Sequence, residues 1–189
     1  MKINKLNLAL VTSLTLVANA STAADTYLSI GATNLNYKEE AYGLKATSDS
    51  YALGLTIGAN IGQNFAVEGL IATGLNSGDI KIKGISGLDG DLKLDSALGI
   101  YGVLRTNENK TGSAYLKAGF TQIQGSGKAT YGTSSASFKT DDSSFSYGIG
   151  IDFKASENSS IRFEYMNYYD QDDITIDGFG IGYKMALPY

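Results

Sequence analysis

Several residue types are missing from this 189-residue chain, and each absence removes a class of chemistry. The chain contains no Cys, no His and no Trp, and its single Pro is Pro188. Without Cys it can form no disulfide bond, no Cys-based zinc site and no cysteine-linked lipid anchor. Without His it lacks the usual general base and the most common metal ligand. We therefore expect neither an enzyme nor a bound cofactor or metal.

The chain also lacks an apolar run long enough to cross a membrane as a helix, which takes about 20 residues. Its N-terminus instead has two lysines, a short apolar run at 6–18 and a stretch of small residues. This is the order of a secretory signal peptide. The cleavage positions that fit are Ala20, Ala23 and Ala24. We favour Ala24 because strand-like sequence follows it, which gives a signal peptide at 1–24 and one mature domain at 25–189.

Positive charge is scarce in the predicted mature chain. Removal of the signal peptide leaves 165 residues with 13 basic and 19 acidic side chains, a net charge of −6. This balance argues against a nucleic-acid partner. Mean hydropathy is close to zero. That value does not exclude a membrane β-barrel, because only alternate residues of a barrel strand face lipid and the signal disappears in an average.

A polar–apolar alternation of period two recurs about eight times, as expected of strands joined by hairpins. The clearest run, 50–60, alternates small residues with Tyr51, Leu53, Leu55, Ile57 and Ala59. Another predicted strand places on one face Leu92, Leu94, Leu98, Ile100 and Leu104. At about 3.3 Å per residue and a tilt near 40°, runs of about 10 to 12 residues cover about 25 to 30 Å, the height of a lipid-facing band.

The connections alternate between short and long. The short ones are predicted at 60–64, 106–112 and 154–159, and the long ones at 38–49, 76–91 and 125–142, with 170–173 as a short exception. Two long connections contain strand-like pieces of their own, which we expect to form protruding hairpins. The pieces are 80–83 with 91–94, and 129–131 with 135–139. The short set is expected to face the periplasm and the long set the outside.

Alternation alone does not distinguish a membrane barrel from a soluble, lipocalin-like barrel with its apolar face inward. The polar face of the predicted strands carries glycines together with Glu68, Lys117, Asp152, Arg162, Glu164 and Lys184. Six charges facing hydrocarbon would be costly, whereas a narrow lumen can pair them. Aromatic residues also gather near the strand ends of the apolar face, as in the girdles at membrane–water interfaces. They are Phe65, Phe153, Phe163 and Tyr189 at one end, and Tyr51, Phe145, Tyr169 and Phe179 at the other.

These features predict an all-β fold, an eight-stranded antiparallel up-and-down transmembrane β-barrel. The chain ends on an alternating apolar series made of Phe179, Ile181, Tyr183, Met185, Leu187 and Tyr189. This series resembles the C-terminal signature of bacterial outer-membrane proteins, which implies recognition by the barrel-assembly machinery. The mature chain as a whole resembles the small eight-stranded surface barrels, the opacity-protein, OmpX and OmpA-barrel group. Its departures are a terminal Tyr where Phe is commoner, and Pro188 beside it.

The lumen charges allow two interpretations, a conduction path or a structural plug of ion pairs. We favour the plug because water-filled channels occur at larger strand numbers. Acidic clusters occur in or beside the predicted outer connections, at 89–91, 141–142 and 170–173. A divalent-cation site is one interpretation. Solvated loop charge, which could meet the cations between lipopolysaccharide molecules, is the one we favour.

The sequence thus predicts a non-enzymatic protein of the bacterial outer membrane, in contact with lipid and lipopolysaccharide. Its rigid barrel would present outer loops for adhesion, surface interaction or envelope integrity, with an extracellular ligand as a further partner. The alternative is a narrow porin-like channel for small solutes. A soluble ligand-binding barrel in the periplasm is a third hypothesis.

Overall fold

The computed structural model describes residues 25–41, 44–82 and 88–188, so the predicted signal peptide and Tyr189 lie outside the described residues. The strands are β1 (Thr26–Ala41), β2 (Leu44–Asn60), β3 (Phe65–Gly74), β4 (Ser77–Asp79), β5 (Lys81–Ile82), β6 (Leu88–Arg105), β7 (Gly112–Tyr131), β8 (Ser134–Lys154), β9 (Ser159–Gln171) and β10 (Ile174–Ala186). In the described ranges no helix has the length and apolar character needed to cross a bilayer.

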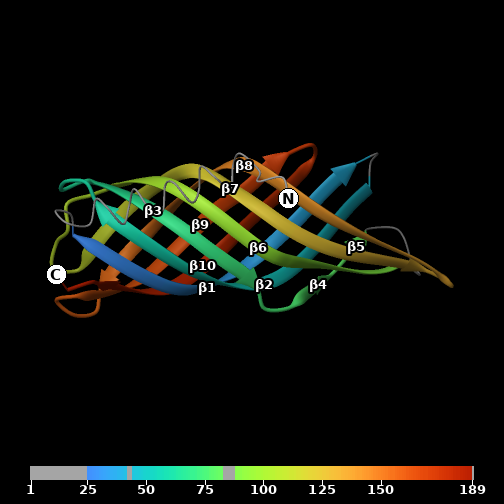
Figure 1. Ribbon diagram of the computed structural model, residues 1–189, viewed down its shortest axis with the longest axis horizontal. Helices are drawn as coiled ribbons and strands as arrows, with labels where there is room; N and C mark the ends of the chain where they lie inside the picture. Colours follow the sequence, from blue (N-terminus) through green and yellow to red (C-terminus); the bar gives the residue numbers. More distant parts are fainter. Residues whose placement is uncertain (1–24, 42–43, 83–87, 189) are drawn as a thin grey trace, which may run out of the picture.

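The eight long strands form a closed antiparallel ring (Figure 1). Each pairs with its neighbours in the order β1–β2–β3–β6–β7–β8–β9–β10, and β1 pairs with β10 to close the sheet. The short strands stand outside this ring order, with β4 paired to β6 and β5 paired to β2. Closure removes the unpaired edges that an open sheet would expose. The predicted eight-stranded up-and-down barrel is confirmed.

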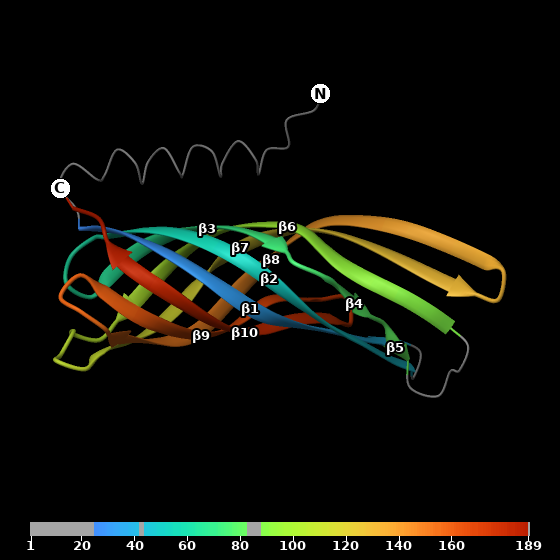
Figure 2. The ribbon, with the colours of Figure 1, turned by 90° about the horizontal axis from the view of Figure 1, so that it is seen from below.

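The two ends of the barrel differ. At one end, the short-turn end, brief connections join β2 to β3, β6 to β7 and β8 to β9. At the other, the extended end, β7 and β8 remain paired as far as Tyr131 and Ser134. The β9–β10 hairpin stops lower, at a tight turn in which Asp172 and Asp173 have positive φ values of 51° and 63°. Such a two-residue turn matches the twist of its strands. The wall therefore rises farthest at β6, β7 and β8 (Figure 2).

Much of the sequence predicted as long outer connections is strand. β1 and β2 pair along residues 38–41 and 44–49, and most of 125–142 belongs to the β7–β8 hairpin. The predicted hairpin of 129–131 with 135–139 is confirmed by pairs such as Ala129 with Ala136. The predicted pairing of 80–83 with 91–94 is wrong. Instead, β4 pairs with residues 91–93 of β6. The next strand, β5, pairs with β2 on the other side.

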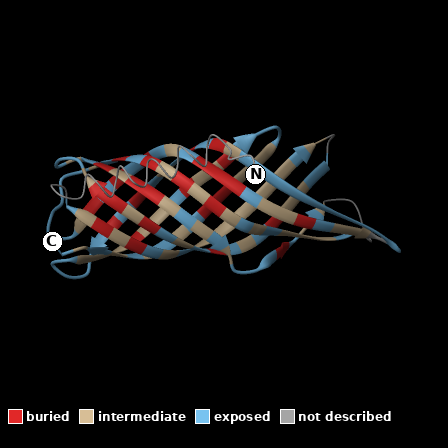
Figure 3. Ribbon diagram, in the orientation of Figure 1, coloured by how far each residue is buried: buried red, intermediate tan, exposed pale blue. Residues whose placement is uncertain are grey.

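The outer surface of the ring is apolar, and its inner surface is largely polar. Large exposed side chains include Ile30, Leu55, Phe120, Ile149, Phe179 and Ile181. Exposed apolar area on this scale is unfavourable in water and suits lipid. Figure 3 shows that the buried residues concentrate in the part of the barrel nearer the short turns. The hypothesis of a soluble barrel with an apolar interior does not fit this distribution.

A bulge in β6 changes which residues face inward. The register with β7 shifts between Leu94 and Ser96, so residues on either side of Asp95 do not share one alternation. Leu98 and Leu104 face outward as predicted, but Leu92 and Leu94 line the interior. The prediction that all these leucines share one face was wrong, because a bulged residue reverses the phase of the strand.

A second irregularity affects the predicted aromatic girdles. The β9–β10 register shifts between Ile176 and Asp177, and Tyr169 is buried against Ala97 and Ile123 instead of facing outward. Its hydroxyl donates to Asp142 Oδ2 at 2.7 Å.

The two predicted girdles are also not separate on this side of the barrel. The ring centroid of Phe163, expected at one end, lies 5.9 Å from that of Phe153 and 6.4 Å from that of Phe179, expected at the other. These three rings therefore form one continuous row across adjacent strands.

Candidate functional site

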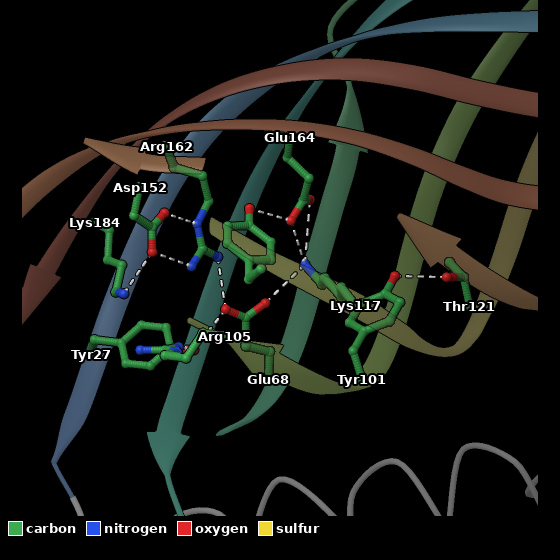
Figure 4. Close-up of polar contacts among 11 residues, drawn as sticks. Tyr27, Glu68, Tyr101, Arg105, Lys117, Thr121, Asp152, Arg162, Glu164 and Lys184 are labelled. Carbon is green, nitrogen blue, oxygen red and sulfur yellow. Dashed lines mark hydrogen bonds and ion pairs between the residues drawn. The ribbon is translucent and has the colours of Figure 1, made fainter. Parts of the chain in front are cut away.

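The six charged residues predicted for the lumen lie together on the inner wall (Figure 4). They come from five strands of the ring, as Glu68 on β3, Lys117 on β7, Asp152 on β8, Arg162 and Glu164 on β9, and Lys184 on β10. Each occupies an inward position of a strand in which the neighbouring residues face outward, since side chains alternate between the two faces. We call this set the lumen network.

Glu68 is at the centre of the lumen network and is fully buried. Its Oε1 accepts hydrogen bonds from Arg162 Nη1 and from the Tyr27 hydroxyl, both at 2.7 Å. Its Oε2 lies 2.9 Å from Lys117 Nζ. A buried carboxylate requires such partners, because desolvation of an unpaired charge costs several kcal/mol.

Arg162 connects Glu68 to a second carboxylate. Its Nε and Nη2 donate to the two oxygens of Asp152, at 2.8 and 3.1 Å. This fork is the bidentate geometry that guanidinium and carboxylate groups favour. Lys184 Nζ lies 2.8 Å from Asp152 Oδ2 and extends the chain of contacts to β10.

Glu164 completes the charge balance. Lys117 Nζ lies 3.1 Å from Glu164 Oε2, and the Tyr115 hydroxyl donates to the same oxygen at 2.8 Å. The network thus contains three carboxylates and three cationic groups, with no net charge. The pairing could not be assigned from the sequence, because partners on different strands are set by barrel register.

Tyrosine rings pack around these charges. Lys184 Nζ lies 4.4 Å from the centroid of the Tyr27 ring, Lys117 Nζ 4.5 Å from that of Tyr101, and Arg162 Cζ 4.7 Å from that of Tyr115. A cation above a ring face is attracted by the ring quadrupole. Tyr27 and Tyr101 were not predicted from the sequence. The sequence feature that could have identified them is alternation, since each lies two positions from another inward-facing residue.

Tyr27 can lie flat against the wall because its neighbour is a glycine. A Cβ on Gly58 would overlap the Tyr27 ring. Arg105 Nη2 donates to the Tyr27 hydroxyl at 3.0 Å, which adds a further cation beside the network.

A layer of uncharged residues lies on the extended-end side of the lumen network. The hydroxyls of Tyr101 and Thr121 are 2.7 Å apart, and Ser146 Oγ donates to Thr121 Oγ1 at 2.8 Å. Met166 is fully buried. Together with the ion pairs, these residues place buried side chains from β3, β6, β7, β8 and β9 inside the barrel.

The predicted C-terminal series lies mainly on the outer face of β10. Phe179, Ile181, Tyr183 and Met185 are exposed there. Leu187 follows the end of the strand, and its N–H donates to the Thr26 carbonyl at 2.9 Å. Tyr189 lies outside the described residues. The exposed row is accessible to a recognition partner, and its role as an assembly signal stays a prediction.

The acidic clusters of the outer connections do not gather into a chelating group. No three metal-ligating side chains come together among the described residues. Asp141 Oδ1 accepts from Gln122 Nε2 at 2.7 Å, and Asp142 accepts from Tyr169.

Comparison with known proteins agrees with this geometry. Residues 6–185 match the family described as "Outer membrane protein beta-barrel domain". The chain belongs to this family. It is therefore a protein of the bacterial outer membrane, and the charged face predicted for the lumen lines the interior of a membrane barrel. A search of curated proteins found no match.

Solved structures of this outer-membrane barrel class have the same fold. Ail, the attachment invasion locus protein of Yersinia pestis, solved with the heparin analogue sucrose octasulfate, is 21% identical with a TM-score of 0.61, over 87% of this chain and 99% of Ail. Neisserial surface protein A is 14% identical with a TM-score of 0.57, over 86% and 97%. OprG from Pseudomonas aeruginosa is 14% identical with a TM-score of 0.56, over 87% and 97%. At these identities the likeness shows the fold alone.

Proposed function

We propose that this outer-membrane barrel is a non-enzymatic surface protein that recognises an extracellular partner through its extended end. The observation that carries the proposal is the unequal height of the wall. Residues 134–146 of β8 pair with β7 and have no ladder partner on β9, whose pairing with β8 begins at Asn167 and Tyr147. The exposed β7–β8 hairpin therefore projects past the turn of β9 and β10.

The orientation follows a general rule for these barrels, in which short turns face the periplasm and the longer connections face outward. The short-turn end is then periplasmic, and the projecting hairpin stands outside the cell. Recognition sites are commonly carried on segments held by a rigid scaffold. Residues 134–142 are exposed on a hairpin that is continuous with the barrel sheet, which fits this role.

The charge of the extended end favours a neutral or cationic partner. Its acidic residues outnumber its lysines, and they include Asp79, Asp89, Asp91, Asp95, Asp141, Asp142, Asp170, Asp172 and Asp173. A sulfated polysaccharide would be repelled by this surface. We therefore do not extend to this chain the heparin analogue with which Ail was solved. Contact with lipopolysaccharide is proposed through divalent cations that bridge phosphate and carboxylate groups.

The channel hypothesis is not favoured by the lumen. Buried ion pairs and hydroxyl contacts occupy its cross-section, and removing charged groups from these contacts to pass a solute would be costly. We propose instead that the lumen network holds the barrel rigid. We further propose that the exposed row on β10 is the segment read by the barrel-assembly machinery.

A shortened hairpin tests the recognition proposal. Gly127 and Phe138 are ladder partners, so an Asn-Gly turn can replace residues 128–137 and close the shortened hairpin. The change also removes the β7 partners of residues 88–91 on β6 and leaves the pairing of Leu92 with Gly127, and of the residues below it, in place. The wild-type protein, expressed in the outer membrane of a Gram-negative host, should raise the adherence of the host cells to an epithelial monolayer several-fold over that of host cells without the protein. The shortened variant should lose this gain.

A variant at the opposite end supplies the control. Glu157→Ser changes an exposed residue between β8 and β9 and should adhere like the wild type. Added sucrose octasulfate should leave adherence unchanged. Equal adherence of the shortened variant and the wild type, at equal surface amounts, would overturn the proposal.

A further inference from the structure

An apolar cavity occupies the extended-end half of the lumen. It has a volume of about 120 Å³ and is lined by residues of all eight ring strands. The apolar part of the lining includes Leu35, Leu70, Leu92, Leu94, Ala97 and Ile123. We call this cavity the outer cup. Its lining differs from the ionic surface of the lumen network, so it is not required for the pairing of those charges.

The floor of the outer cup is formed by the uncharged layer around Tyr101 and Thr121. Along β6 the inward positions after Ala97 are Gly99 and Tyr101, and the Tyr101 hydroxyl packs over Gly99. The hydrogen bonds of Tyr101 and Thr121 then separate the cup from the charges of Glu68 and Lys117. A molecule that enters from the extended end would be held in the cup and would not pass through.

The outer cup is long and narrow. On β2 its lining runs from Ser48 to Gly54. At about 3.3 Å per residue and a tilt near 40°, this stretch spans about 15 Å of height. The volume is of the order of the ~150 Å³ apolar cavity that holds a benzene molecule in an engineered protein. A narrow space of this length suits an extended aliphatic chain better than a compact ring.

One polar group in the lining lacks a partner. Ser48 is buried, with 5% of its surface exposed, and its Oγ has no hydrogen-bond partner among the described residues. It pairs across the ladder with Tyr37, near the outer part of the cup. Its Oγ lies beside Gly78 of β4, so the Ser48 side chain must rotate to present this oxygen to the cavity. Buried hydroxyls are normally hydrogen-bonded, so an unsatisfied one in the cavity wall indicates a position where a ligand group would bind after that rotation.

The absence of charged side chains pointing into the cup indicates that the polar end of a ligand would be uncharged. Lys93 is the one charged residue among the described residues that line the cup. It alternates with the inward-facing Leu92 and Leu94, so its side chain points away from the cavity. A charged head group would therefore find no counter-ion inside, whereas an uncharged hydroxyl or carbonyl could bond to Ser48.

From these observations we infer that the outer cup binds a single-chain amphiphile from the extracellular side. Its aliphatic tail lies between the leucines and Ile123, and its uncharged hydrogen-bonding head reaches Ser48 Oγ. The binding requires no movement of the lumen network, and residues 128–137 of the β7–β8 hairpin do not line the cup.

Methyl chemical shifts measured by NMR test this assignment, with 1-octanol as the probe and the mature protein in lipid nanodiscs. Octanol also partitions into lipid, so Ile149 on the lipid face serves as an internal reference. The methyl signals of Leu94 and Ile123 should shift with saturation, while those of Ile149 should change only in proportion to the octanol added. Shifts at Ile149 without saturable shifts at Ile123 would overturn the proposal.

Variants locate the site. Ala97→Phe on β6 and Ala52→Leu on β2 fill the cup from two different strands, so the test survives if one of them fails to fold. Both should abolish the saturable shifts, whereas Leu98→Phe on the outer face should retain them. Ser48→Ala should weaken octanol binding by about fivefold, the scale of one lost hydrogen bond. Saturable binding that persists in a folded, filled variant contradicts the site, and unchanged affinity in Ser48→Ala contradicts the placement of the head.

Discussion

Arg162 Nη1 lies 2.7 Å from Glu68 Oε1, although 94 positions separate the two residues in the chain. Arg162 is on β9 and Glu68 on β3, and these strands stand four places apart in the ring of eight. The contact therefore spans the lumen and joins opposite walls of the barrel. Because Arg162 also binds Asp152 through its other nitrogens, one guanidinium fixes three strands relative to one another.

Removal of Arg162 should destabilise the barrel strongly. Arg162→Met leaves Glu68 and Asp152 buried with fewer cationic partners, and losing one partner of a buried pair costs about 3 to 5 kcal/mol. Urea unfolding of the refolded protein in lipid vesicles measures the change. Lys154→Met provides the matched control, because Lys154 pairs with Glu108 at 3.2 Å on an exposed rim. The Lys154→Met variant should lose less than about 1 kcal/mol of unfolding free energy. Similar losses in both variants would contradict the buried network.

Glu68 and Arg162 should also couple in a double-mutant cycle. The combined variant Glu68→Gln with Arg162→Met removes both partners of the contact. Its loss of unfolding free energy should be smaller than the sum of the single losses by about 0.5 to 3 kcal/mol, the range for residues in direct contact. Additive losses would mean that the two side chains do not interact across the lumen.

The packing of Tyr27 over Gly58 makes a separate prediction. In Gly58→Ala the new methyl group would overlap the ring, and the ring would have to leave its contacts with Glu68 and Arg105. Overpacking of this kind costs about 1 to 3 kcal/mol. Gly102→Ala is the control, because its nearest neighbour would be a backbone oxygen at 3.9 Å on the lipid face. Equal urea midpoints for the two variants would rule out the proposed role of Gly58.

The sequence was sufficient to predict the ring of strands and the inward charges, because both follow from strict alternation. It was not sufficient for Leu92, Leu94 and Tyr169, since a bulge changes the phase of a strand without a residue type that marks it. The outer cup was missed for the same reason, because two of its leucines were assigned to the lipid face. The ion pairs could not be assigned either, since strand register determines which inward positions lie at the same level.

The orientation can be tested because the chain has no native cysteine. Ser135→Cys places a thiol on the exposed β7–β8 hairpin, and Glu157→Cys places one in the exposed β8–β9 turn. In intact cells a membrane-impermeant maleimide should label the first variant and not the second, while both should react after lysis. Labelling of Glu157→Cys in intact cells would reverse the proposed orientation.

The central claim is that buried ion pairs close the lumen, so that function resides at the outer end. Single-channel recording of the refolded mature protein in a planar bilayer tests it most directly, with insertion verified by protease protection. The closed lumen predicts a silent bilayer for the wild type. Discrete openings whose size changes in Arg162→Ala would contradict the plug and make the lumen network a conduction path.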